Sequence, residues 1–183
     1  MELNSTSYVV LGMLRHEPRS GYEIKAAVDN STRFFWAASY GQIYPELRRL
    51  AEAGLVEGEA HATGGRKRTV YRLTPAGRIE LRRWLTEPAE TLELRDEGLL
   101  KMFFADSAAP GRAVELLDER RRLHEQKIAR LRAVEPKAAA AAGAGDPYPY
   151  LVLRYGVEMS EWTIAWCERL QAELDPETVK AAR

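Results

Sequence analysis

The segment 39–56, SYGQIYPELRRLAEAGLV, places side chains suited to DNA contact on one side of a potential helix. At about 100° per residue, Ile43, Leu47 and Leu50 form one apolar stripe that predicts packing into a core. Polar and aromatic side chains share the other side: Gln42, Tyr44, Arg48 and Arg49. Glutamine can pair with adenine, arginine with guanine, and tyrosine can donate to a phosphate. An ordinary solvated helix face explains this segment slightly better when it is taken alone.

Three successive cations, Arg66, Lys67 and Arg68, follow two glycines in the run GGRKR. On either side, residues 55–60 and 69–73 have the length of strands, and the Gly-Gly sequence favours a hairpin between them. A basic hairpin tip can lie along a DNA backbone or enter a minor groove. A solvated turn explains the triplet by itself, but a helix, a strand and a basic tip in this order favour DNA binding.

Cap signals define the elements that must position these side chains. Residues 20–23 and 39–42, SGYE and SYGQ, fit the capping-box pattern and predict helices that begin at Ser20 and Ser39. Gly54 is expected to close the second of these helices. Thr74-Pro75 predicts a helix over 75–85, and an apolar stretch around 8–14 predicts the first helix. Three helices, two strands and a helix make a winged helix-turn-helix.

Pro45 is an anomaly in this scheme, because a proline six positions into a helix loses a hydrogen bond and crowds the carbonyl of Gly41. Two alternatives remain open at this stage. The first turn is distorted there, or the helix proper begins nearer Tyr44.

The second half of the chain is expected to be helical over 92–105, 110–134 and 148–174, with a loose connection over 137–149. Apolar residues recur at helical steps in the last helix: Tyr155, Met159, Trp162, Trp166 and Leu170. In the preceding helix, Arg121 and His124 interrupt the stripe. Three helices cannot bury all these faces alone, so a second subunit is expected to share them. The predicted fold is mainly α with a small β-hairpin, with domains at 1–86 and 87–183.

Charge supports two different roles for the halves. Residues 1–85 carry 13 Lys and Arg against 9 Asp and Glu, and the remainder carries 14 against 18, for a formal net charge of zero. No signal peptide and no apolar run of membrane-spanning length occurs, so a cytoplasmic, nucleoid-associated protein is expected. The lone Cys167 excludes an intrachain disulfide and is expected to be a small core residue. The three histidines lie in different elements and no phosphate loop follows a strand, so neither catalysis, nor a metal, nor a cofactor is expected.

Several motifs together resemble the PadR family of bacterial transcriptional regulators: YVVLGML (8–14), SGYEI (20–24), SYGQIYPELRRLAEAGL (39–55), the basic wing and YRLTPAGR (71–78). The resemblance implies a homodimer that binds a pseudo-palindromic operator, usually as a repressor. It also implies a helical C-terminal dimerisation domain, as in a related virulence activator. The expected DNA-contacting residues are Tyr22, Ser39, Tyr40, Gln42, Tyr44, Arg48, Arg49, Arg66, Lys67 and Arg68. Tyr22 could equally fill the core.

The family also implies release by a small aromatic or drug-like effector. Candidate pocket residues are Phe34, Trp36, Met159, Trp162 and Trp166, for which ordinary core packing is the simpler explanation. An alternative function for the whole chain is a winged-helix module for protein–protein contact, which would not need the wing cations.

Overall fold

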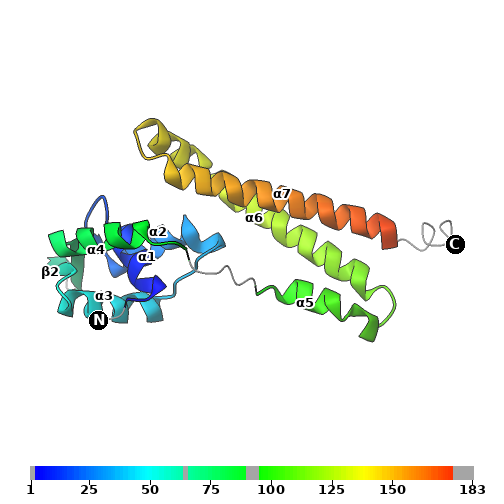
Figure 1. The fold of residues 1–183 in the computed structure, drawn as a ribbon, viewed down its shortest axis with the longest axis horizontal. Helices are drawn as coiled ribbons and strands as arrows, with labels where there is room; N and C mark the ends of the chain where they lie inside the picture. The colour runs from blue at the N-terminus through cyan, green and yellow to red at the C-terminus, as the bar shows by residue number, and fades with distance from the viewer. Residues whose placement is uncertain (1–2, 64–65, 90–94, 175–183) are drawn as a thin grey trace. The chain divides into compact units, whose positions relative to one another are not determined.

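A computed structural model describes residues 3–63, 66–89 and 95–174, with the backbone alone for 61–63, 66 and 67. The chain divides into two compact units, Met1–Thr91 and Leu92–Arg183. The first contains helices and a small sheet, and the second is helical throughout its described part (Figure 1). The expected fold class, mainly α with a small β-hairpin, is confirmed.

In the first unit the element order matches the expectation, with one additional short strand. The helices are α1 (Ser5–Met13), α2 (Gly21–Asp29), η1 (Thr32–Phe34), α3 (Tyr40–Glu52) and α4 (Pro75–Thr86), and the strands are β1 (Arg19–Ser20), β2 (Val56–Thr63) and β3 (Arg66–Leu73). Ser20 and Ser39 are the N-caps of α2 and α3, and both capping boxes form. Cap chemistry in the sequence therefore located these helix starts.

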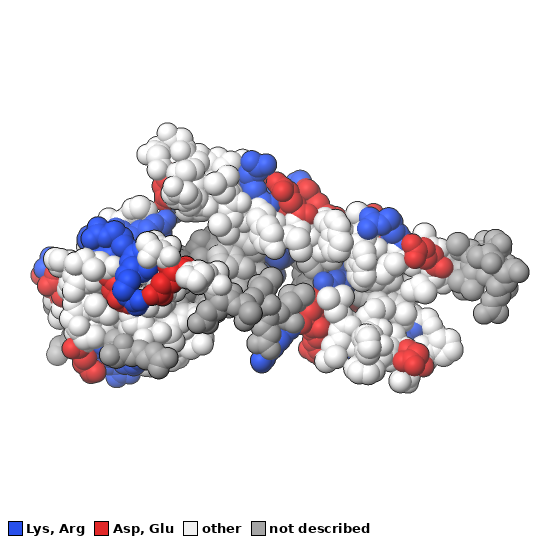
Figure 2. Space-filling view, viewed as in Figure 1, with Lys and Arg blue, Asp and Glu red and all other residues white. Residues whose placement is uncertain are grey.

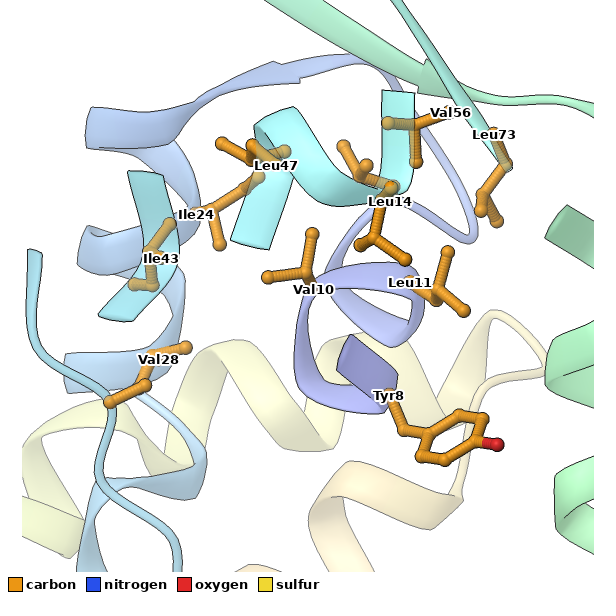
Figure 3. Packing of buried hydrophobic residues seen from close by; sticks show 12 residues of the cluster. Tyr8, Val10, Leu11, Leu14, Ile24, Val28, Ile43, Leu47, Val56 and Leu73 are labelled. Carbon is orange, nitrogen blue, oxygen red and sulfur yellow. The ribbon is translucent and has the colours of Figure 1, made fainter. Parts of the chain in front are cut away.

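The core of this unit lies between three helices and the base of the hairpin (Figure 3). Val10 and Leu11 of α1, with its C-cap Leu14, meet Ile24 and Val28 of α2 and the α3 stripe. Val56 and Leu73 close the side next to the sheet. Ile43, Leu47 and Leu50 are completely buried, as the helical wheel predicts. These contacts fix the orientation of α3 and thereby the direction of its outer face.

The sheet has the order β1-β3-β2, with antiparallel pairing throughout. The hairpin register runs from Val56 opposite Leu73 to Thr63 opposite Arg66, so both strands are longer than expected. Arg66, Lys67 and Arg68 belong to β3 rather than to a loose tip.

Helix α4 begins as the sequence indicates, with the Thr74 hydroxyl accepting from Gly77 N at 3.0 Å. A Cβ at Gly77 would lie 2.0 Å from the carbonyl oxygen of Leu55. The glycine of the LTPAGR motif is therefore required by the close approach of α4 to the start of β2.

The second unit comprises α5 (Glu97–Phe103), η2 (Ala105–Ser107), α6 (Arg112–Gly143) and α7 (Tyr148–Leu174). The expected loose connection over 137–149 is wrong in its first half, because α6 continues through Pro136 to Gly143. The alanines that follow Pro136 favour this extension, because alanine has the highest helix propensity. The proline leaves the carbonyl of Arg132 without its helical hydrogen bond, but both residues are exposed, so water can bind that oxygen. Gly145, at φ +100°, then ends the helix.

Helices α6 and α7 pack along each other as an antiparallel pair (Figure 1). The face of α7 buried in this pair repeats every three and four residues and is mostly small: Leu153, Gly156, Ser160, Thr163 and Cys167. The Ser160 and Thr163 hydroxyls donate to carbonyls one turn earlier, so neither is an unsatisfied polar group. Cys167 is a buried core residue, as expected, and burial raises the pKa of its thiol.

Candidate nucleic-acid interface

Helix α3 is fixed at both ends. At its N-terminus, Ser39 N and Oγ donate to Gln42 Oε1 at 2.9 and 3.0 Å. At its C-terminus, Gly54 has φ +69° and Leu55 N donates to Leu50 O at 2.9 Å, which completes a Schellman motif. Gly54 therefore closes the helix as the sequence predicts. The caps and the buried stripe make α3 a rigid support for its outer side chains.

The cap restricts what Gln42 can read. Both acceptor sites of its side-chain oxygen are occupied by Ser39, while the Nε2 amide group keeps its two donors on an exposed side chain. Bidentate pairing with adenine needs the donor and the acceptor together. Gln42 in this conformation is thus suited to donate to a base-edge acceptor or a phosphate, which narrows the expectation drawn from its residue type.

Three exposed tyrosines form a row across α2 and α3. Tyr22 and Tyr40 have ring centroids 6.4 Å apart, and Tyr40 and Tyr44 lie 6.1 Å apart. Tyr22 is 66 % exposed, which rules out the alternative that it fills the core. The Tyr44 ring covers the α carbon of Gly21, where an added Cβ would lie 2.7 Å from the ring. The rings restrain one another, and their hydroxyl groups are donors suited to phosphate oxygens.

The two arginines of α3 differ. Arg48 is exposed and has no ion-pair partner among the residues that the structure describes. Arg49 is half-buried and donates to Glu46 Oε2 at 2.7 Å, while Glu46 Oε1 accepts from the buried Ser7 hydroxyl of α1. Sequence reasoning missed Glu46, because its partner lies 39 residues away. Arg48 is the better candidate for a phosphate contact, and Arg49 is restrained by Glu46.

The three predicted wing cations differ in what the structure describes of them. The side chains of Arg66 and Lys67 lie outside the described residues. Arg68 forms an ion pair with Glu23 of α2 instead of projecting freely. This pair and the Ser20 backbone N–H hold the pKa of the Glu23 carboxyl at about 2. Of the three wing cations, Arg68 is therefore already partnered within the protein.

Pro45 lies inside α3, which begins at Tyr40 and continues without interruption. The helix therefore does not start nearer Tyr44. Both Pro45 and Gly41, whose carbonyl loses its partner, lie on the exposed side, where water can satisfy that oxygen. The cost of this proline is reduced by its position on the outer face.

A second exposed face lies on α7 and is apolar. Tyr148, Tyr155, Met159 and Trp162 are exposed at steps of three, four or seven residues, and the Trp162 and Trp166 rings stack with centroids 6.3 Å apart. Trp162 is 56 % exposed, so packing within one chain does not explain this stripe. Phe34 and Trp36 belong to the first unit, and the joint effector pocket predicted for the five aromatic and methionine positions stays a prediction.

On the face shown in Figure 2, basic and acidic side chains lie beside one another in both units. No group of three or more potential metal ligands occurs within the described part of the chain. None of the described helices has the length and hydropathy of a membrane span.

A three-helix unit with a β-hairpin wing defines the winged helix-turn-helix class, and comparisons with known proteins agree. Residues 10–83 match the transcriptional regulator PadR-like family, and residues 94–175 match the virulence activator alpha C-terminal domain. The negative transcriptional regulator PadR of Bacillus subtilis is 30 % identical over 92 % of this chain and 96 % of its own length.

Two solved structures extend the likeness across both units. Bacillus subtilis PadR in complex with operator DNA has a TM-score of 0.85 and 29 % identity, covering 96 % of this chain and all of that one. The same protein with p-coumaric acid has a TM-score of 0.75, covering 95 % and 99 %. This chain belongs to the PadR-like family of transcriptional regulators, which is not a family of enzymes.

Proposed function

We propose that this regulator is a homodimeric, ligand-responsive repressor that binds a pseudo-palindromic operator through α3 and the wing. The observation that carries the proposal is the outer face of α3, where Tyr40 and Tyr44 of the tyrosine row, the Gln42 donors and the exposed Arg48 share one capped helix. The Bacillus subtilis relative is bound to operator DNA in its structure, which supports the same partner here. Such a protein would act on the nucleoid, in the cytoplasm.

We propose that α7 forms the dimer interface. Its exposed aromatic stripe continues for most of the helix, and water is a poor partner for so much adjacent apolar surface. A two-fold axis would let the same stripe of two chains cover each other. Dimerisation also brings two α3 helices to the two halves of a pseudo-palindrome.

The proposed effector is a small aromatic molecule. The relative binds p-coumaric acid, and this chain offers aromatic and sulfur-containing side chains at Phe34, Trp36, Met159, Trp162 and Trp166. Ligand sites are mostly apolar with a few polar groups, which suits this composition. A ligand that fits the DNA-free form better would lower operator affinity.

The test is binding of the purified dimer to the DNA upstream of its own gene, titrated with salt. Replacing Arg48 with Gln is expected to lower the slope of log affinity against log salt by about 0.9, because one phosphate contact is lost. Arg82→Gln, on exposed α4, makes the same charge change away from α3 and should leave the slope unchanged. Salt-independent binding, or no effect of Arg48→Gln, would favour the alternative of a protein–protein module.

A further inference from the structure

One carboxylate joins three elements of the first unit. Glu23 is the third residue of α2, and its Oε2 accepts from Ser20 N at 2.8 Å and from Ser20 Oγ at 2.9 Å. The other oxygen, Oε1, pairs with Arg68 of β3. The same side chain thus caps a helix and holds a strand of the wing.

The backbone brings the same three elements together. Strand β1 pairs with β3 through Ser20 opposite Val70 and Arg19 opposite Tyr71, so the N-cap of α2 is itself a sheet residue. Arg68 precedes Val70 by two positions and shares its side of the strand. The ion pair lies two residues beyond the last β1–β3 pair, toward the wing tip. It extends the attachment of the wing past the point where β1 ends.

We infer that Glu23 and Arg68 form a latch that sets the angle of the wing against α2, and that Arg68 acts on operator binding as a positioning residue rather than as a phosphate contact. The inference rests on the proposed DNA-binding function. It predicts that removing the negative charge of Glu23 weakens DNA binding. A direct phosphate contact by Arg68 predicts the opposite sign, because Glu23 would then compete with the phosphate.

The discriminating variant is Glu23→Gln, because glutamine at the third helical position can still accept from Ser20 and keep the capping box. The matched control is Glu57→Gln, which removes the same charge from the ion pair that Glu57 forms with Arg72 on the same hairpin, at 2.7 Å. Arg68→Gln and the double variant Glu23→Gln/Arg68→Gln complete a cycle.

Operator affinity is expected to fall roughly two- to fivefold for Glu23→Gln, the range for a partly exposed ion pair, and not to fall for Glu57→Gln. Arg68→Gln should weaken binding by a similar factor without changing the salt slope, and the double variant should be no weaker than either single one. Tighter binding by Glu23→Gln, or a slope about 0.9 smaller for Arg68→Gln, would overturn the latch.

Amide hydrogen exchange in the DNA-free protein provides a readout that does not depend on DNA. Exchange at residues 68–71 of β3 should be roughly two- to fivefold faster in Glu23→Gln and Arg68→Gln, and unchanged in Glu57→Gln. Equal exchange rates in all four proteins would overturn the latch. If the wild-type protein bound no operator while the exchange rates still differed, the proposed function would fail and the latch would stand.

Discussion

The outer faces of α3 and α7 differ in what they require from a partner. Helix α3 anchors itself with bulky Ile43, Leu47 and Leu50 and presents amide, hydroxyl and guanidinium donors. Helix α7 does the reverse, with small residues buried against α6 and an aromatic stripe outside. Water forms hydrogen bonds with the donors of α3 until DNA replaces it. Exposed aromatic rings form no comparable bonds with water. A transient partner therefore fits α3, and a permanent one fits α7.

The magnitudes agree with this assignment. A fully buried tryptophan removes about 150–250 Å² from water, and 56 % of the Trp162 surface is still exposed. Each Å² of apolar surface that is covered contributes about 25 cal/mol. Several aromatic residues along one helix are therefore sufficient for a stable dimer. A single phosphate contact contributes less and depends on salt. Changes to α7 should affect assembly, and changes around α3 should lower DNA affinity without changing the dimer dissociation constant.

The largest expected effect is that of Trp162→Glu. A charge at the centre of the α7 stripe would be desolvated in the dimer, so we expect the dimer dissociation constant to rise about 1000-fold, or about 4 kcal/mol. Sedimentation equilibrium measures this constant directly, and circular dichroism should show unchanged helix content. Operator affinity should fall with the loss of the dimer.

Leu123→Glu is the control for this change. Leu123 lies on α6, is also largely exposed, and has polar residues at the positions three and four away on each side: Glu119, Arg120, Gln126 and Lys127. We expect its dimer to remain intact. An intact Trp162→Glu dimer would show that the aromatic stripe is not the subunit interface.

A smaller effect is expected for Gly21→Ala. Alanine normally stabilises a helix relative to glycine by up to about 1 kcal/mol, but here its methyl group would lie 2.7 Å from the Tyr44 ring. We expect Tyr44 to be displaced, operator affinity to fall roughly tenfold, and unfolding free energy to fall by about 1 kcal/mol. The dimer constant should not change. Fluorescence anisotropy and urea titration measure the first two quantities.

Gly12→Ala separates this steric effect from helix propensity. Gly12 lies in α1 with nothing within 4 Å of an added Cβ, so its replacement should stabilise the protein and leave DNA affinity unchanged. Equal behaviour of the two variants would mean that the packing of Tyr44 on Gly21 has no role in DNA binding.

Local signals in the sequence predicted the first unit well, because caps, turns and amphipathic stripes are properties of a few neighbouring residues. Ser20, Ser39, Gly54 and Thr74 all have the expected roles. Long-range pairs were not predictable: Glu46 with Ser7, and Arg68 with Glu23. In such pairs residue type alone does not distinguish a side chain that contacts DNA from one that is bound within the protein.

In the second unit, local sequence signals predicted the extent of a helix incorrectly. Two glycines and two prolines within 137–149 indicated a loose connection, but the alanine run and packing against α7 extend α6 through Pro136 to Gly143. Local helix breakers were overridden by propensity and tertiary contact. The apolar stripe of α7 was recognised as a packing surface, yet only the structure separates its buried side from its exposed side.

The smallest predicted effect is a pH dependence of stability that arises from His124, and it compares a polar group inside each unit. Glu46 is buried but has both oxygens bonded, whereas His124 of α6 has a buried Nδ1 with no hydrogen-bond partner within the described part of the chain. Burial lowers the pKa of His124 below its ordinary value of 6.5, and the cations Arg120 and Lys127 lower it further, while Asp96 opposes them. The unfolded chain therefore binds the proton more readily than the folded one.

Stability should accordingly be greatest when His124 is neutral, above pH 6.5, and should decline as the pH falls toward the lower folded-state pKa. His124→Leu removes this titration and continues the apolar stripe of α6, so the urea midpoint of the variant should decline less than that of the wild type over the same interval. Parallel profiles for the two proteins would show that the folded protein tolerates a protonated His124. The polar middle turn of α6 would then be as well satisfied as the Glu46 site of the first unit.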